Sequence, residues 1–222
     1  MFNDFLHLIF PETCVACDEV LPKGKEHLCH VCTQLLPFAE INSDETFRKL
    51  AGRVDVEAAF AYLKFNKTGI VQKLLHNLKY NNNPELGHFI GREFGSYLKD
   101  QNIELPKDGL IPVPLHPSRQ KERGYNQAEV IANGLAESSG SGVSVSYLKR
   151  IKESISQTKK GRAARLTNMS ECFSLNEKTD IKGLHVGLVD DVITTGATIE
   201  ACCLCLKAAG VGKITVFTIA NA

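Results

Sequence analysis

The spacing of apolar residues changes several times along the chain and predicts strands that alternate with helices. Continuous or alternating apolar runs indicate strands, and apolar residues three or four apart indicate amphipathic helices. The expected strands and apolar runs are 56–65, 110–113, 145–148, 185–189 and 214–219. The expected helices are 69–80, 86–98, 126–137 and 197–209. This alternation is typical of an α/β fold with a parallel sheet covered by helices on both faces.

Four cysteines ahead of these elements have the spacing of metal ligands. They form two C-x2-C pairs separated by eleven residues: Cys14, Cys17, Cys29 and Cys32. Disulfides are the alternative, but a chain without an export signal is expected among reductants, where this spacing favours a four-cysteine zinc site. With four protein ligands the zinc is structural, and it replaces a core that a segment of roughly 40 residues is too short to build. His27 and His30 are either substitute ligands or surface residues.

The acidic part of the 222-residue chain coincides with the segment that contains the two C-x2-C pairs. The chain has a net charge of +1, but residues 1–45 hold eight acids against Lys23 and Lys25, which is −6 and leaves +7 for residues 46–222. We therefore expect a zinc-binding module at 1–45 and a larger domain at 46–222. The basic domain either handles an anion or has a solvated basic surface. Its most basic part, residues 149–165, is expected to be a mobile loop.

The chain shows no sign of export or membrane insertion. No apolar run reaches the roughly 18 to 20 uncharged residues that a bilayer span requires. The first ten residues lack the basic start and cleavage site of a signal peptide. We expect a cytoplasmic protein without a membrane span.

The string VGLVDDVITTGAT at 186–198 carries the most chemistry. It predicts a buried strand that brings Asp190 and Asp191 to its carboxyl end, followed by a turn that opens a helix. Ligands bind beyond the carboxyl ends of such strands, and a helix N-terminus holds phosphate well. The turn offers hydroxyl donors and one glycine for close backbone approach: Thr194, Thr195, Gly196 and Thr198. The acids can accept hydrogen bonds from ribose hydroxyls, so a ribose 5-phosphate fits both groups. The alternative is a turn without a ligand, in which Asp191 or Thr195 only caps the helix.

Residues 190–198 resemble the phosphoribosyl pyrophosphate (PRPP) motif of type I phosphoribosyltransferases. Three further features narrow the resemblance to the ComF family of competence-type phosphoribosyltransferase-like proteins. They are the four-cysteine module, Lys79-Tyr80 after the first helix, and VPLHPSRQKERGYNQAE at 113–129. Gln157, Arg165, Asn168 and Phe173 follow downstream, while Ser154 stands where the family usually has threonine. The resemblance implies a type I phosphoribosyltransferase fold with a flexible hood at 150–165.

The resemblance also implies roles for individual residues. Arg119 and Arg123 are expected to bind the pyrophosphate of PRPP through their forked guanidinium groups. Each arginine alone could equally form a surface salt bridge. Asp190 and Asp191 take the catalytic role of orienting the ribose and offsetting its positive charge, together with Mg²⁺ on the pyrophosphate. The remaining residues expected to bind substrate are Lys79, Gln157, Arg165, Thr194, Thr195, Gly196, Ala197 and Thr198.

Two functions from different classes follow from the resemblance. The first is transfer of phosphoribosyl from PRPP to a nitrogen acceptor, or use of PRPP in competence and DNA uptake. The second is a non-catalytic protein that senses PRPP and binds single-stranded DNA, with DNA-uptake proteins as partners. The chain shows no general base, and Tyr125 is the one aromatic residue inside a basic motif, so stacking partners for bases are sparse. A homodimer is compatible with either function.

Overall fold

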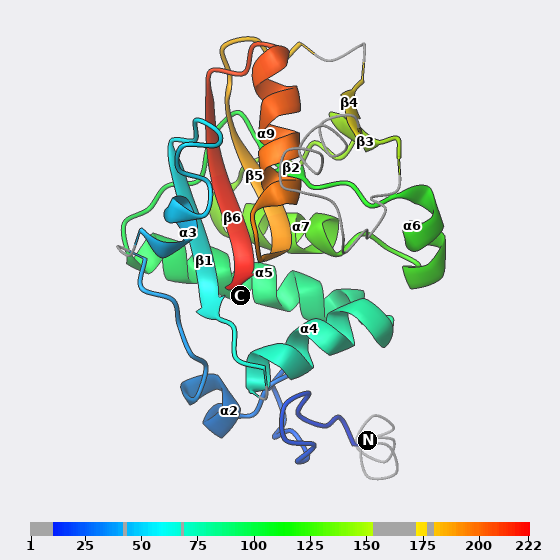
Figure 1. Ribbon diagram of the computed structural model, residues 1–222. Coiled ribbons are helices and arrows are strands. Elements are labelled where there is room, and N and C mark those ends of the chain that lie inside the picture. Colours follow the sequence, from blue (N-terminus) through cyan, green and yellow to red (C-terminus); the bar gives the residue numbers. More distant parts are fainter. Residues whose placement is uncertain (1–10, 42–43, 68, 153–171, 177–179) are drawn as a thin grey trace.

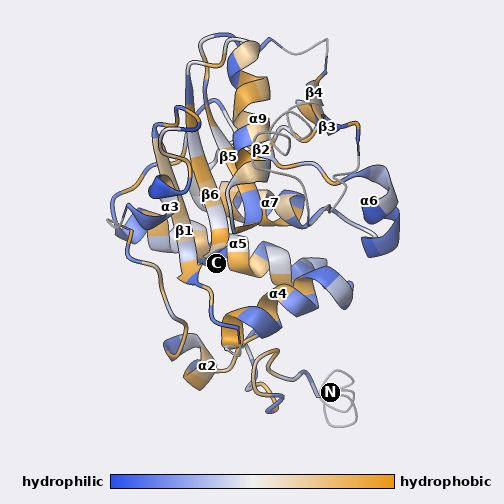
Figure 2. Cartoon of the chain, viewed as in Figure 1, coloured by the Kyte–Doolittle hydropathy of each residue, from blue (hydrophilic) through white to orange (hydrophobic). Residues whose placement is uncertain are grey.

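The computed structural model describes residues 11–41, 44–67, 69–152, 172–176 and 180–222 (Figure 1). Its centre is a four-stranded parallel sheet with the order β1-β6-β5-β2. The strands are β1 (Ala58–Lys64), β2 (Leu110–Pro112), β5 (His185–Ile193) and β6 (Lys213–Asn221). Every residue is buried from Val186 to Val189 in β5 and from Ile214 to Asn221 in β6, and most of these residues are apolar, as expected of strands that are covered on both faces (Figure 2).

Helices cover both faces of this sheet, and the side chains of β5 show which helices lie on which face. Val186 and Leu188 pack in the same cluster as α9 (Ala197–Ala208), whereas Val189 packs with the cluster of α4, α5 and α7. These three helices are α4 (Ile70–Tyr80), α5 (Pro84–Asp100) and α7 (Gln127–Ser139). In Figure 1, α9 lies along one side of the sheet and the green α5 and α7 cross the other side. The predicted α/β architecture, with helices on both faces of a parallel sheet, is confirmed.

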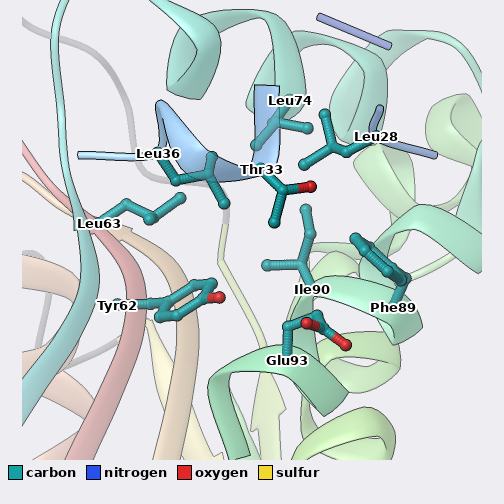
Figure 3. A pocket seen from close by; sticks show the side chains of 9 residues that line it. All are labelled: Leu28, Thr33, Leu36, Tyr62, Leu63, Leu74, Phe89, Ile90 and Glu93. Carbon is teal, nitrogen blue, oxygen red and sulfur yellow. The ribbon is translucent and has the colours of Figure 1, made fainter. Parts of the chain in front are cut away.

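The four-cysteine segment packs against one end of this second helix layer. Its short helix α2 (His30–Gln34) and the turns before it bury Leu28 and Leu36 in the same cluster as Leu63 of β1 and Leu74 of α4. A small apolar pocket remains at this joint, with Tyr62 and Glu93 among its lining residues (Figure 3). Lys73 Nζ donates a hydrogen bond to the Ala16 carbonyl, and Arg92 forms an ion pair with Glu26 at 2.6 Å. The segment is therefore fixed to the sheet domain by both apolar and polar contacts.

Several elements differ from the pattern-based expectations. Residues 44–53, for which the apolar pattern predicts no element, contain the short helix α3 (Glu45–Arg48) and then the fully buried Leu50. Residues 117–123 form α6 (Pro117–Arg123), which buries no residue, so its sequence carries no apolar period (Figure 2). The strand expected at 145–148 begins only at its last residue, as β3 (Leu148–Arg150), and pairs antiparallel with β4 (Phe173–Leu175). Residues 149 and 150 thus belong to a small hairpin outside the main sheet.

The helices in the described part of the chain were also compared with the requirements of a bilayer crossing. None of them combines the necessary length with the necessary apolar character.

Candidate functional site

The chain leaves the adjacent strands β2 and β5 in opposite directions, which creates a crevice between their carboxyl ends. After β2 the chain passes through α7 on one face and returns at Val143, which bridges to Leu110 on the outer side of β2. After β5 the chain passes through α9 on the opposite face and moves the other way, to β6. Such a switch point leaves a crevice beyond the strand ends in which open α/β sheets bind ligands.

Asp190 and Asp191 lie at this crevice, but on opposite faces of β5. The strand continues through both acids to Ile193, and side chains alternate along a strand. Asp190 therefore shares the α9 face with Leu188, and Asp191 shares the other face with Val189. Lys79, at the end of α4, forms an ion pair with Asp191 at 2.7 Å between Nζ and Oδ2. Two residues that the sequence assigned to the site separately, Lys79 and Asp191, are thus brought together across 112 residues of sequence.

Asp190 has no such short ion pair among the described residues, and its environment favours the protonated form. Burial is the largest cause and the neighbouring Asp191 carboxylate is the next, and together they raise the pKa of Asp190 to about 7. The hydrogen bond from the Asp191 backbone N–H, at 2.9 Å, acts in the opposite direction, as do the charges of Lys79 and Arg150. A bound cation or hydroxyl donor would favour the carboxylate form.

The threonine loop, residues 194–198, is open to solvent where it faces the crevice. Thr194 and Thr195 are exposed, and Ala197 and Thr198 are half-buried in the first turn of α9. Gly196 is the N-cap of α9 with φ of 76°, and no side chain makes a capping hydrogen bond there. The first N–H groups of α9 therefore lack the side-chain acceptor that the capping alternative requires of Asp191 or Thr195.

Residues from the 44–53 segment hold the threonine loop from behind. Arg53 donates Nη1 hydrogen bonds to the Thr195 and Lys49 carbonyls, and its Nη2 pairs with Glu200 in the first turn of α9. The Arg53 and Glu200 side chains are only 17% and 4% exposed. The φ of 76° favours glycine at position 196, and a Cβ there would also be tight, 3.0 Å from Leu50 Cδ2 and 3.2 Å from the Lys49 carbonyl oxygen. Sequence analysis missed Arg53 and Glu200, because nothing in the local pattern links residues so far apart.

The RGYNQ string at 123–127 begins with Arg123, the last residue of α6, and the residues that follow hold Arg123 and the start of α7 in place. Arg123 Nη1 donates to Gln127 Oε1 at 2.9 Å, and Gln127 is buried. Asn126 caps α7 by accepting from Ala128 N at 3.2 Å and also donates to the Val113 carbonyl at 3.1 Å. Tyr125 donates its hydroxyl to the Leu78 carbonyl near the end of α4. The string therefore ties α6 and α7 to the strand end and to Lys79.

The two arginines expected to bind pyrophosphate differ in their surroundings. Arg119 is exposed on α6. The guanidinium of Arg123 is half-buried and lies 5.9 Å from the centre of the Tyr80 ring. Arg123 contacts the Tyr80 ring, and Lys79, the residue before Tyr80, forms the ion pair with Asp191. Arg123 and Asp191 are therefore linked through two adjacent residues of α4. Gln157 and Arg165, the other expected ligands, and the hood from residue 153 to 165 lie outside the described residues.

The four cysteines form a separate cluster at the other side of α4. Their sulfur atoms all lie within 4.8 Å of one another, so Cys14, Cys17, Cys29 and Cys32 can hold one metal ion. The Cys29 backbone N–H donates to Cys14 Sγ at 3.4 Å. Burial would raise the pKa of Cys14, but this hydrogen bond and those from the Ala16 and Cys17 backbones outweigh it and lower the pKa to about 6. Burial raises the pKa of Cys32 in the same cluster, so a bound cation such as Zn²⁺ would favour the thiolate form there. The later cysteines, in contrast, include the fully buried Cys202 and Cys203 in α9.

Comparison with known proteins places the chain in a family. No family model matches it. It is 32% identical to competence protein F of Haemophilus influenzae over 154 residues, which cover 67% of each chain. The chain belongs to the ComF family. Within this family it is also 26% identical to competence protein ComFC of Bacillus subtilis over 221 residues, or 95% of this chain and 87% of the relative. It is 27% identical to DNA utilization protein YhgH of Salmonella typhimurium over 150 residues, covering 66% and 65% of the two chains.

Two solved structures show a limited structural similarity to the chain. One is the allosteric regulatory enzyme of purine biosynthesis, with 20% identity, a TM-score of 0.43, and coverage of 64% of this chain and 29% of that one. Another is a hypoxanthine phosphoribosyltransferase from Staphylococcus aureus, with 15% identity, a TM-score of 0.35, and coverage of 62% and 64%.

Proposed function

We propose that the protein binds PRPP together with Mg²⁺ in the crevice between β2 and β5. The 5-phosphate lies at the threonine loop and the N–H groups of α9, and the ribose hydroxyls meet the acids. The pyrophosphate is directed toward Arg119 and Arg123. Mg²⁺ prefers carboxylate and phosphate oxygens, which this set of groups supplies, and it would neutralise charge on the pyrophosphate.

The observation that carries this proposal is the open threonine loop at the switch point of the sheet. The loop is held from behind by the buried Arg53–Glu200 pair, its glycine has a positive φ and little space for a Cβ, and its helix lacks a side-chain cap. A turn that served only to connect β5 to α9 would have no need of exposed hydroxyls and uncapped N–H groups. An anion satisfies both.

The reaction that this arrangement supports is displacement of pyrophosphate from C1 of the ribose by a nitrogen nucleophile. The C1–O bond breaks as the C1–N bond forms, so positive charge grows on the ring and negative charge on the leaving group. Asp191 is placed to offset the first charge, and Arg119 and Arg123 the second. With or without an acceptor, PRPP is the proposed ligand of this ComF-family protein, in line with the use of PRPP in competence or DNA uptake.

Isothermal titration of PRPP with Mg²⁺ tests the site. We expect binding by the natural protein, a strong loss in Asp191→Ala, and a loss in Thr195→Val, which keeps the shape of the side chain but removes the hydroxyl. Thr46→Val is a matched control, because Thr46 is buried in α3. Absence of heat from the natural protein, or equal affinity in Asp191→Ala, would contradict the proposal. Release of pyrophosphate in the presence of a panel of amines and bases identifies an acceptor.

We also propose that the four-cysteine cluster binds structural zinc. The metal would join the two cysteine pairs and hold the segment that packs on β1 and α4. Native mass spectrometry should detect one zinc ion per chain, and Cys17→Ser should lose it and lower the melting temperature. Cys205→Ser, in α9, should retain the ion. Full stability after complete chelation would show that the module folds without metal.

The names of the relatives favour a second candidate, which is a PRPP-sensing protein that binds single-stranded DNA. One relative is a competence protein and another a DNA utilization protein, and residues 46–222 carry a net charge of +7. Phosphate contacts make such binding weaken with rising salt concentration. Anisotropy measured with a labelled single strand at several salt concentrations tests this candidate, and salt-independent binding or no binding would oppose it.

A further inference from the structure

Tyr80 is an exposed aromatic residue beside the proposed PRPP site. It is the last residue of α4, and its side chain is 65% exposed. The other four tyrosines of the chain are buried or half-buried. A single exposed aromatic ring is ordinary on a protein surface, so its neighbours decide whether it has a role.

The surroundings of Tyr80 hold the ring in place. The His76 ring lies 5.0 Å away, one turn earlier on α4, at an interplanar angle of 46°. The Arg123 guanidinium, which is itself held by the buried Gln127, lies 5.9 Å from the ring centre. The backbone just before Tyr80 is fixed by the hydrogen bond from the Tyr125 hydroxyl to the Leu78 carbonyl. The ring is therefore both accessible and anchored through its helix.

The charges around Tyr80 select the kind of ligand. Lys79 and Arg123 flank it, and Arg119 and Lys121 are exposed on the same short helix as Arg123. A planar aromatic ring between cations fits a planar group that is attached to, or bound next to, phosphates. Nucleobases have this chemistry, whereas aliphatic amines lack the π-face that would gain from stacking.

We propose that Tyr80 is a stacking platform for a nucleobase at the edge of the PRPP site. The position of the base rests on the proposed function, because Lys79, the neighbour of Tyr80, pairs with Asp191 of that site. The base comes from one of two sources, a free base that acts as acceptor or a base within single-stranded DNA. In the sequence Tyr80 served only as part of the family resemblance, and Tyr125 was the aromatic residue considered for stacking, but the Tyr125 hydroxyl donates to the Leu78 carbonyl.

The test for the single-strand source compares two oligomers of about 20 units with equal numbers of phosphates, one of thymidine and one abasic. We expect the natural protein to bind the thymidine oligomer about tenfold more tightly than the abasic one, since stacking on an aromatic residue is of that size. Tyr80→Leu should lose this preference, while its binding of the abasic oligomer stays the same. Tyr80→Phe is the matched control, because it keeps the ring and should keep the preference.

The test for the free-base source is equilibrium dialysis of adenine and cytosine with PRPP and Mg²⁺ present. Retention of a base by the natural protein and by Tyr80→Phe, but not by Tyr80→Leu, would identify a free base as the ligand. If Tyr80→Leu matches the natural protein in both tests, or if neither a base nor the thymidine oligomer is preferred, the platform is refuted.

Titration of PRPP into Tyr80→Leu separates this inference from the proposed function. We expect PRPP affinity within about twofold of the natural protein, because Tyr80 is not assigned to the phosphates or the ribose. Failure of the natural protein to bind PRPP would refute the proposed function, whatever the oligomers show. Normal PRPP binding without any base preference would refute only the platform.

Discussion

The two faces of the sheet at the carboxyl end of β5 use ion pairs in different ways. On the α4 face, the side chains of Lys79 and Asp191 are 25% and 15% exposed, so their pair borders the crevice. On the α9 face, Arg53 and the almost fully buried Glu200 lie behind the threonine loop. A ligand can reach Lys79 and Asp191 and replace either partner of their pair, whereas it cannot reach the buried pair of Arg53 and Glu200. The comparison indicates that the α4 face contacts the ligand, whereas the α9 face holds the threonine loop in its conformation.

Breaking the buried pair should have the largest effect on stability. Glu200→Ala leaves the Arg53 guanidinium without its carboxylate, and we expect a loss of about 2 to 4 kcal/mol in the free energy of unfolding. Urea denaturation measures this loss. The double variant Arg53→Met/Glu200→Met should recover much of it, because an apolar pair removes both charges. A loss below about 0.5 kcal/mol in Glu200→Ala would show that the pair does not support the loop.

Removing the crevice-side cation should act mainly on binding. Lys79→Met takes away the partner of Asp191 and a positive charge beside the proposed anion, so PRPP affinity should fall about tenfold to a hundredfold. Lys73→Met is the matched control on the same helix, since Lys73 contacts the Ala16 carbonyl of the cysteine segment. Isothermal titration compares the two variants, and an equal change in both would mean that Lys79 has no special role.

Neutralising Asp190 should change the pH dependence of stability. Its pKa is raised from 3.8 to about 7 in the folded protein, so the stability that the proton confers is complete below the lower value and is lost as the pH rises through 7. Asp190→Asn does not undergo this loss. Relative to the natural protein it should gain about 1 to 3 kcal/mol between roughly pH 5 and pH 8. Urea titrations across this range measure the gain, and parallel stability curves for the two proteins would rule out the raised pKa.

The smallest effect is expected at a pair that is fully accessible to water. Arg48 and Asp44 are 3.9 Å apart with side chains 78% and 71% exposed. Arg48→Ala should change the free energy of unfolding by less than about 0.5 kcal/mol. The same urea denaturation provides the baseline against which the Glu200 effect is judged. A larger loss would mean that α3 itself, and not the Arg53–Glu200 pair, limits stability.

Much of the fold could be predicted because its signals are local. The apolar period defined α4, α5, α7 and α9 to within a few residues, since each buries one face along its length. The same signal failed for α6, which buries nothing, and for residues 44–53, where the two buried residues, Thr46 and Leu50, form no apolar period. The strand expected at 145–148 was shifted, because a three-residue hairpin strand is too short for its alternation to mark its ends.

The sequence by itself determined the cysteine spacing, the order of strands and helices, and the acids and threonines that follow one another in β5 and its turn. These features depend on neighbouring residues, whose separation the backbone geometry limits. Only the tertiary structure decided that Lys79 meets Asp191, that Arg53 supports Thr195, and that Tyr80 stands beside Arg123. Packing of the helices on the two faces of the sheet creates these contacts, and no local spacing records which distant side chains it will join.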